Sequence, residues 1–348
     1  MTAFLVPLLR AIGALLLSLS LCHAAPPLPA IGARVDLTTV SGISSGAALA
    51  EQFSVAYSSI VVGKALIAAI PYGCALYRKG KRTGAPLWNA LTTCTDPAAY
   101  GIAPPDAAVL FASAQQQAAR GAIDPVAMLA RQQVYVFTGM NDAIVARAVA
   151  LQTVRFAQLA GVASDAIVYK ADVAAGHGFI VDRRGAVACE QTAPPFINDC
   201  RLMLAHAMLH HIYRTSAPLS QPAAPPLSAA VAAFDQSEFG GGMDGTGYVY
   251  IPAACRAGGC KVHIALHGCR QTAATIADAF YGGAGYNELA DSNGIVVLYP
   301  QAKRSVLPLN PYGCWDYWGY SGADFTSRRA PQLAALRAML ARLASRAD

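Results

Sequence analysis

Residues 42–46, with the sequence GISSG, have the residue types and spacing that can make a serine hydroxyl a nucleophile. They fit the G-x-S-x-G pattern, in which a strand turns sharply into a helix and exposes the central serine. An extended run, Val35–Ser41, precedes the segment, and a run of helical composition, Ala47–Tyr57, follows it. An ordinary Gly/Ser loop could have the same letters, but these flanking elements favour a nucleophile elbow with Ser44 at its centre.

A nucleophilic serine needs a general base and an acid that orients the base. Asp142 follows the predicted strand Val134–Thr138, in a strand-end loop that suits the acid, although Asp is equally natural there as a helix N-cap. His177 lies between two glycines, after the predicted strand Ala166–Tyr169. The chain order Ser44, Asp142, His177 is the order of the triad in α/β-hydrolases.

The other histidines fit a catalytic base less well. His206, His210 and His211 share a predicted helix, and the spacing of the first two could bind a metal, but no carboxylate joins them on that face. His263 lies within a predicted strand. The chain also has no CxxC pair, so we expect no metal site.

An acyl-transfer site also needs donors for the oxyanion. One should be the backbone N–H after the nucleophile, on Ser45, and the other normally comes from a loop after a strand that precedes the elbow. Nothing between residue 26 and the elbow supplies a His-Gly loop of this kind, but residues 266–269 (LHGC) do. This order predicts a circularly permuted chain, in which the Pro/Gly-rich residues 215–247 join the original termini. The alternative is a plain His-Gly turn and a fold of two domains.

The elements that must position these residues alternate between strands and helices. Such alternation predicts an α/β fold with a parallel sheet flanked by helices. The remaining predicted strands are 60–70, 248–251, 261–266 and 294–299, and the remaining predicted helices are 143–159, 201–213 and 331–346.

Residues 1–24 have the pattern of a secretory signal peptide. Arg10 precedes an apolar run, Ala11–Leu21, and small residues follow. The run is short for a membrane span, and nothing later reaches 18 continuous apolar residues. We therefore expect a secreted or periplasmic protein with no stable membrane insertion after the signal is removed.

Eight cysteines remain after the signal segment. An even number in an oxidising compartment favours disulfides, although eight cysteines allow 105 pairings. Proximity in the sequence predicts the pairs Cys74–Cys94, Cys189–Cys200, Cys255–Cys260 and Cys269–Cys314.

The composition excludes two classes of protein. Hydrophobic residues make up 55% of the 348 residues and charged residues 13%. A disordered chain has low hydrophobicity and high net charge, so this composition excludes disorder. The net charge is only +6 and the basic residues are scattered. A nucleic-acid-binding surface needs a basic cluster, so we expect no nucleic-acid partner.

Aromatic residues gather between positions 312 and 320. This segment contains Tyr312, Trp315, Tyr317, Trp318 and Tyr320. Core packing would explain them, but a loop rich in Gly, Asn, Pro and Tyr is a poor core element, and exposed rings suit a flat apolar polymer. We expect substrate contact by Tyr312, Trp315 and Trp318.

Taken together, these motifs resemble the extracellular poly(3-hydroxybutyrate) depolymerase family, in its circularly permuted, single-domain form. The resemblance covers almost the whole mature chain. It rests on residues 42–46, 139–142, 176–178, 266–269 with Gln271, and 310–320.

The resemblance implies a role for each part of the site. Ser44 would be the nucleophile, Asp142 the acid and His177 the base, with the amides of Ser45 and Cys269 forming the oxyanion hole. Trp315 would line the substrate crevice. Residues 25–348 would form one catalytic α/β-hydrolase domain with no separate polymer-binding domain.

The expected function is hydrolysis of poly(3-hydroxybutyrate) or its oligomers through an acyl-enzyme. The chain would act as a monomer, with a polyester or oligoester as its partner and without a cofactor. A generic carboxylic-ester hydrolase, similar to feruloyl or acetyl esterases, is the alternative. A non-catalytic polymer-binding protein is a further alternative, against which the intact serine, acid and histidine argue.

Overall fold

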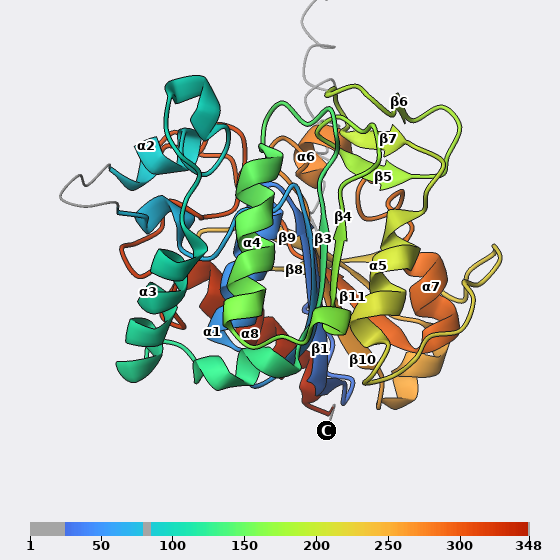
Figure 1. Ribbon diagram of the computed structural model, residues 1–348. Coiled ribbons are helices and arrows are strands. Elements are labelled where there is room, and N and C mark those ends of the chain that lie inside the picture. Colours follow the sequence, from blue (N-terminus) through green and yellow to red (C-terminus); the bar gives the residue numbers. More distant parts are fainter. Residues whose placement is uncertain (1–24, 79–84, 347–348) are drawn as a thin grey trace, which may run out of the picture.

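The computed structural model of the chain describes residues 25–78 and 85–346 (Figure 1). The predicted signal peptide, residues 1–24, lies outside the described residues. From Arg34 to Lys170, successive strands are separated by helices, as the apolar runs of the sequence predict.

An eight-stranded, mostly parallel sheet runs through the middle of the molecule (Figure 1). The first six strands of its spatial order are parallel, and the last two are antiparallel to their neighbours. In spatial order, the strands are β4 (Ile167–Lys170), β3 (Gln133–Phe137), β2 (Val61–Ile67), β1 (Arg34–Ile43), β10 (Lys261–Leu266), β11 (Ile295–Tyr299), β9 (Thr246–Tyr250) and β8 (Ala232–Asp235).

Helices cover both faces of the sheet, because a parallel sheet buries both of its faces. One face packs against α1 (Ser45–Ala56), α4 (Arg147–Leu159) and α8 (Pro331–Ala344), with α3 (Ala107–Ala119) outside α4. The opposite face packs against α5 (Leu204–Tyr213) and α7 (Tyr286–Asn293) (Figure 1). Two short helices, α2 (Pro86–Leu91) and α6 (Ala273–Ile276), complete the described α-helices. The predicted α/β class with a mostly parallel sheet is therefore confirmed.

The strand beside β1 comes from the second half of the chain. β10 pairs with β1 on one side and with β11 on the other. The His-Gly loop after β10 consequently lies at the same edge of the sheet as the turn after β1, since the carboxyl ends of parallel strands meet there. The circular permutation stays a prediction, and this sheet order is the one that it requires.

The predicted connection, residues 215–247, is more structured than a linker. Its first part runs along α7, where the Ala223 N–H donates to the Glu288 carbonyl across 2.8 Å. Its second part contains β8 and the start of β9, which form an antiparallel pair at one edge of the sheet. The sequence predicted this connection but not the edge strand β8 within it.

A second, small sheet follows β4. It consists of β5 (Phe179–Val181), β7 (Ile197–Asp199) and β6 (Val187–Ala188) in that spatial order. Within residues 25–78 and 85–346, no helix is long and apolar enough to cross a bilayer. The same residues hold no cluster of three His, Cys, Asp or Glu side chains placed to bind a metal.

Candidate active site

The turn between β1 and α1 holds Ser44 in a strained backbone conformation. Its φ and ψ are 58° and −120°, values that a residue with a side chain rarely adopts. Such strain persists where the surroundings enforce it and is typical of functional sites. Here the Ser44 N–H donates to the Ile67 carbonyl across 2.9 Å. The turn leaves the Ser44 side chain partly exposed at the carboxyl edge of the sheet.

Glycine is required on the helix side of this turn and on its strand side. A Cβ atom on Gly42 would lie 2.3 Å from the backbone of Gly46. A Cβ atom on Gly46 would lie 2.3 Å from the His267 carbonyl oxygen. The GISSG segment therefore brings strand, helix and the His-Gly loop into direct backbone contact.

Asp142 and His177 lie in contact at the same edge of the sheet. Asp142 stands in the loop after β3, and His177 stands in the loop between β4 and β5. The His177 Nδ1 atom lies 2.9 Å from Asp142 Oδ2 and 3.1 Å from Oδ1. The Asp142 side chain is only 2% exposed and that of His177 11%. The structure thus brings together two residues that are widely separated in the sequence.

The Asp142 carboxylate is also held by the backbone. Its Oδ1 atom accepts from the N–H groups of Ile144 and Val145, both at 2.9 Å. These bonds do not cap a helix, because α4 begins later, at Arg147, and not at the predicted residue 143. An ionised carboxylate only accepts hydrogen bonds, so His177 Nδ1 carries the proton and its Nε2 is left as the acceptor. That is the tautomer of a general base.

The glycines beside His177 allow its loop to pack closely. A Cβ atom on Gly176 would lie 2.4 Å from the Gln191 carbonyl oxygen, and one on Gly178 would lie 2.1 Å from Asn198 Oδ1. The loop is tied down further by the His177 N–H, which donates to the Thr192 hydroxyl across 2.9 Å.

Two backbone amides near Ser44 are free to bind a ligand. The N–H groups of Ser45 and Cys269 donate to no acceptor among the described residues. The N–H group of Gly268, the residue before Cys269, is not free, because it donates to Gln271 Oε1 across 2.8 Å. Gln271 in turn donates through Nε2 to the carbonyls of Pro195 and Phe196. This glutamine therefore fixes the His-Gly loop against the chain that leads into β7.

His267 supports the loop and does not take part as a base. Its Nε2 accepts from the Ala302 N–H across 3.1 Å, so its proton is on Nδ1, which donates to the Gly268 carbonyl across 2.7 Å. The side chain is fully buried. Burial lowers the pKa of the imidazole to about 4, so His267 is neutral at pH 7.

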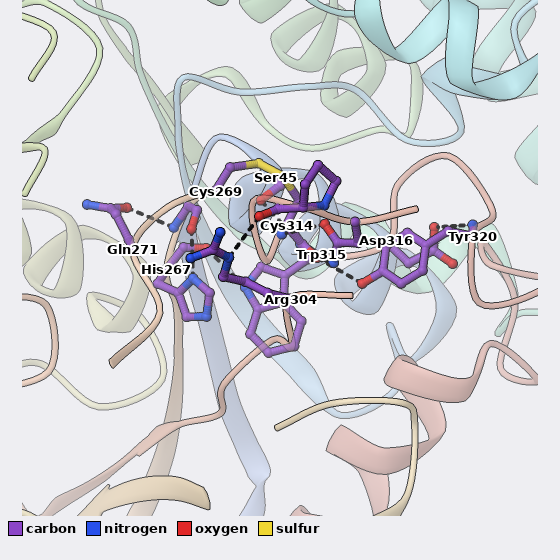
Figure 2. The surroundings of a disulfide bond; sticks show 12 residues. Ser45, His267, Cys269, Gln271, Arg304, Cys314, Trp315, Asp316 and Tyr320 are labelled. Carbon is purple, nitrogen blue, oxygen red and sulfur yellow. Dashed lines mark hydrogen bonds between the residues drawn. A yellow bond between two sulfur atoms is a disulfide. The ribbon is translucent and has the colours of Figure 1, made fainter. Parts of the chain in front are cut away.

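The disulfide Cys269–Cys314 joins the His-Gly loop to the aromatic segment (Figure 2). The next residue, Trp315, donates its backbone N–H to Ser45 Oγ across 3.3 Å. Its indole Nε1 donates to the His267 carbonyl across 3.0 Å. Figure 2 shows these residues clustered around the disulfide. The candidate oxyanion donors are thus held by covalent and hydrogen bonds.

The burial of Trp315 corrects one expectation from the sequence. Its side chain is 0% exposed and belongs to the core, so its ring does not present itself to substrate. The reason is its hydrogen bond to His267, which draws the indole under the His-Gly loop. Trp318 is partly exposed and Tyr312 is 48% exposed. Substrate contact by these two residues stays a prediction.

Asp316 is a supporting residue that sequence reasoning missed. Its buried carboxylate accepts from the N–H groups of Trp318, Gly319, Tyr320 and Ser321. Four donors on one carboxylate hold the loop 316–321 in a tight turn. The only signal in the sequence is an Asp followed by a Gly-containing loop, which is too common to identify such a role.

The structure contains all four predicted disulfides. Besides Cys269–Cys314, it has Cys74–Cys94, Cys189–Cys200 and Cys255–Cys260. The second of these closes the small sheet behind His177, at β6 and β7. The third lies at the start of β10, at the opposite end of that strand from the candidate site.

Known proteins match most of the chain in sequence. A family model described as esterase PHB depolymerase matches residues 247–347. A poly(3-hydroxybutyrate) depolymerase from Delftia acidovorans is 38% identical over 329 residues; the match covers 93% of this chain but 63% of that protein. A polyhydroxybutyrate depolymerase from Talaromyces funiculosus is 34% identical over 331 residues, which cover 90% of this chain and 91% of that protein.

Solved structures match at the level of the fold and the sequence. The crystal structure of PHB depolymerase from Penicillium funiculosum has a TM-score of 0.81 and 30% identity to this chain. The match covers 91% of this chain and 98% of that one. A PHB depolymerase complexed with an R3HB trimer matches with the same TM-score, identity and coverage.

Proposed function

The chain belongs to the PHB depolymerase family, and on that premise we propose that it is a secreted serine esterase that hydrolyses poly(3-hydroxybutyrate) or its oligomers. The observation that carries the proposal is the pairing of His177 with the buried Asp142 at the sheet edge where Ser44 adopts its strained turn. Four disulfides support an oxidising, extracytoplasmic location.

In the proposed mechanism, the Ser44 hydroxyl attacks the ester carbonyl carbon and His177 Nε2 takes its proton. Asp142 keeps the imidazole in the required tautomer and stabilises its charged form. The developing oxyanion accepts from the Ser45 and Cys269 N–H groups, and each donor contributes about 3–4 kcal/mol in a comparable hydrolase.

The collapse of this intermediate breaks the bond between the carbonyl carbon and the alkoxy oxygen. His177 returns its proton to the alkoxy oxygen, and the shortened chain leaves as an alcohol. Water then attacks the acyl-enzyme with His177 again as the base, which releases a carboxylic acid and restores Ser44. The reaction as proposed consumes one water molecule, and its catalytic groups are side chains and backbone amides of this protein.

Contact with a solid polyester requires exposed apolar surface. The loop 305–312 supplies it, since Val306 is 82%, Leu307 90% and Leu309 58% exposed. Apolar side chains gathered at one surface mark interaction sites. We propose that this loop, with Tyr312, rests on the polymer.

The test compares wild-type protein with Ser44→Ala on poly(3-hydroxybutyrate) film and on a soluble short-chain ester. We expect the wild type to clear the film and hydrolyse the ester, and the variant to do neither while it keeps its circular dichroism spectrum and melting temperature. Ser45 is unsuitable as a control because it touches Trp315, so Ser54→Ala on the same helix serves as the matched serine control.

Three outcomes would contradict parts of the proposal. Substantial activity in Ser44→Ala would refute the nucleophile. Hydrolysis of soluble esters without film clearing would indicate a generic esterase. Film binding without hydrolysis of either substrate would indicate a polymer-binding protein.

A further inference from the structure

A cavity of about 230 Å³ opens next to the candidate oxyanion loop. It is lined by Pro194, Arg270, Thr275, Arg304, Pro311 and Tyr312. Arg270 directly follows Cys269, whose N–H is one of the two free amides. A chain with its ester at these amides would therefore have this cavity as its immediate neighbour.

The backbone and the ring of Tyr312 hold Arg270 in place. Arg270 has a positive φ of 63°, which a residue with a side chain rarely adopts. Its N–H donates to the Tyr312 carbonyl across 2.7 Å, and its guanidinium lies 4.1 Å from the centre of the Tyr312 ring. A cation above an aromatic face is attracted to it and keeps its N–H groups available at the rim. Arg270 is thus oriented without a carboxylate partner.

Arg304 brings a second guanidinium to the same cavity. Its Nε donates to the Pro311 carbonyl across 2.8 Å, and its side chain is drawn in Figure 2 beside the Cys269–Cys314 disulfide. Among residues 25–78 and 85–346, no carboxylate forms an ion pair with Arg270 or Arg304. None of the six residues that line the cavity is acidic. Two cations therefore face one small cavity without a balancing anion.

The walls between the two cations are mostly apolar. Pro194, Pro311 and the Tyr312 ring contribute rings, and Thr275 contributes a methyl group and a hydroxyl. The cavity therefore matches a ligand that has a carboxylate at one end and methyl and methylene groups behind it. Guanidinium groups bind carboxylates with paired, charge-assisted N–H···O bonds.

We propose that this cavity binds the terminal carboxylate of a 3-hydroxybutyrate oligomer whose ester lies at the Ser45 and Cys269 amides. The inference rests on the proposed function, because that function supplies such chains. Each cleavage of the polyester creates one new carboxylate end, so the cavity selects the oligomers that the reaction itself produces. The protein then cleaves oligomer acids in preference to chains whose ends are uncharged.

The experiment compares the 3-hydroxybutyrate trimer acid with its methyl ester, in which an uncharged methyl ester replaces the terminal carboxylate, and it follows only cleavage of the ester bonds between 3-hydroxybutyrate units. We expect wild-type kcat/KM to be higher for the acid, mainly through a lower KM. Arg304→Gln and Arg270→Gln should each lower the acid-to-ester ratio by about tenfold, which corresponds to about 1.4 kcal/mol. Added NaCl should reduce the wild-type ratio, because salt screens partly exposed charges.

Lys303→Gln is the matched control. It removes one exposed positive charge from the residue next to Arg304, but Lys303 does not line the cavity. Its acid-to-ester ratio should equal that of the wild type. An equal fall in the control would assign the preference to the general positive field and would overturn the proposal.

A binding assay separates this proposal from the proposed function. Calorimetric titration of Ser44→Ala with the trimer acid and with its methyl ester needs no turnover. Tighter binding of the acid than of the methyl ester supports the cavity as an oligomer-end site. Arg304→Gln should weaken the binding of the acid, whereas acetate at equal ionic strength should not. Equal binding of acid and ester overturns the proposal. Failure of the wild type to hydrolyse either trimer would instead contradict the proposed function.

Discussion

Gly46 and His267 approach so closely that a Cβ atom on the glycine would lie 2.3 Å from the histidine's carbonyl oxygen. The same Cβ atom would lie 2.5 Å from the Leu266 carbonyl oxygen. The first turn of α1 and the end of β10 therefore meet backbone to backbone. This contact sets where the Ser45 and Cys269 amides stand relative to each other.

Gly46→Ala should disrupt the candidate site. Backbone atoms block the new Cβ atom on the His267 side, so either the elbow or the His-Gly loop has to move. A shift of about 1 Å at a catalytic site can lower kcat by roughly a hundredfold. Steady-state hydrolysis of a soluble ester and a melting curve measure the two effects. Gly245→Ala, where a Cβ atom meets open space, is the control and should match the wild type.

Loss of the Cys269–Cys314 disulfide should impair both stability and activity. The bond spans 45 positions, for which the loop-entropy relation gives about 4 kcal/mol of stabilisation. It also fixes the loop that carries the Cys269 N–H, so the double variant with serine at both positions should lose activity below its own melting temperature. Urea unfolding and ester hydrolysis at 20 °C measure the two quantities separately.

The Cys255–Cys260 disulfide provides the control for this experiment. It spans 5 positions at the other end of β10, so its removal should cost about 2 kcal/mol by the same relation. Ester hydrolysis by the folded protein should stay at the wild-type level. If removal of Cys255–Cys260 lowered kcat as much as removal of Cys269–Cys314, the special role of Cys269–Cys314 would be wrong.

The parallel strands and the pairing of cysteines were predictable from the sequence. β10 occurs at its predicted bounds, Lys261–Leu266, because a short, mostly apolar run that ends at a turn is the pattern of a buried strand. The contact of Asp142 with His177 followed from strand-end positions, since the carboxyl ends of parallel strands converge. These features depend on local pattern and sheet topology.

Other features depend on contacts that the sequence does not reveal. β8 is four residues long and rich in alanine, so its identity as a strand comes from pairing with β9. α7 is short and polar, lies between Gly285 and Gly294, and was not predicted. The sequence could not show that Trp315 is buried, because its burial depends on the distant His267 carbonyl.

A buried ion pair under the elbow helix gives a further prediction. Lys64 Nζ on β2 lies 2.7 Å from Glu51 Oε2 on α1, and their side chains are 2% and 0% exposed. Lys64→Met leaves a buried carboxylate without its partner and should lower the free energy of unfolding by about 3–5 kcal/mol. The combined Lys64→Met and Glu51→Leu protein should recover most of this loss. Urea unfolding measures all three proteins.

The exposed pair of Arg329 and Asp324 is the control for that series. Asp324→Asn should change the unfolding midpoint much less than Lys64→Met, because water already solvates both charges. If Lys64→Met were as stable as the wild type, the buried pair would not be a charged pair in the folded protein.

Two buried histidines should make the protein less stable in mild acid. Burial lowers the pKa of His263 to about 3 and that of His267 to about 4, whereas both are near 6.5 when the chain is unfolded. Below pH 6.5 the unfolded chain therefore binds protons that the folded one does not. Each histidine should lower the free energy of unfolding by about 2 kcal/mol between pH 7.5 and pH 5. Urea unfolding of the wild type and of His263→Gln across this range measures the effect. The variant should have the shallower pH dependence, and identical slopes would show that His263 does not contribute.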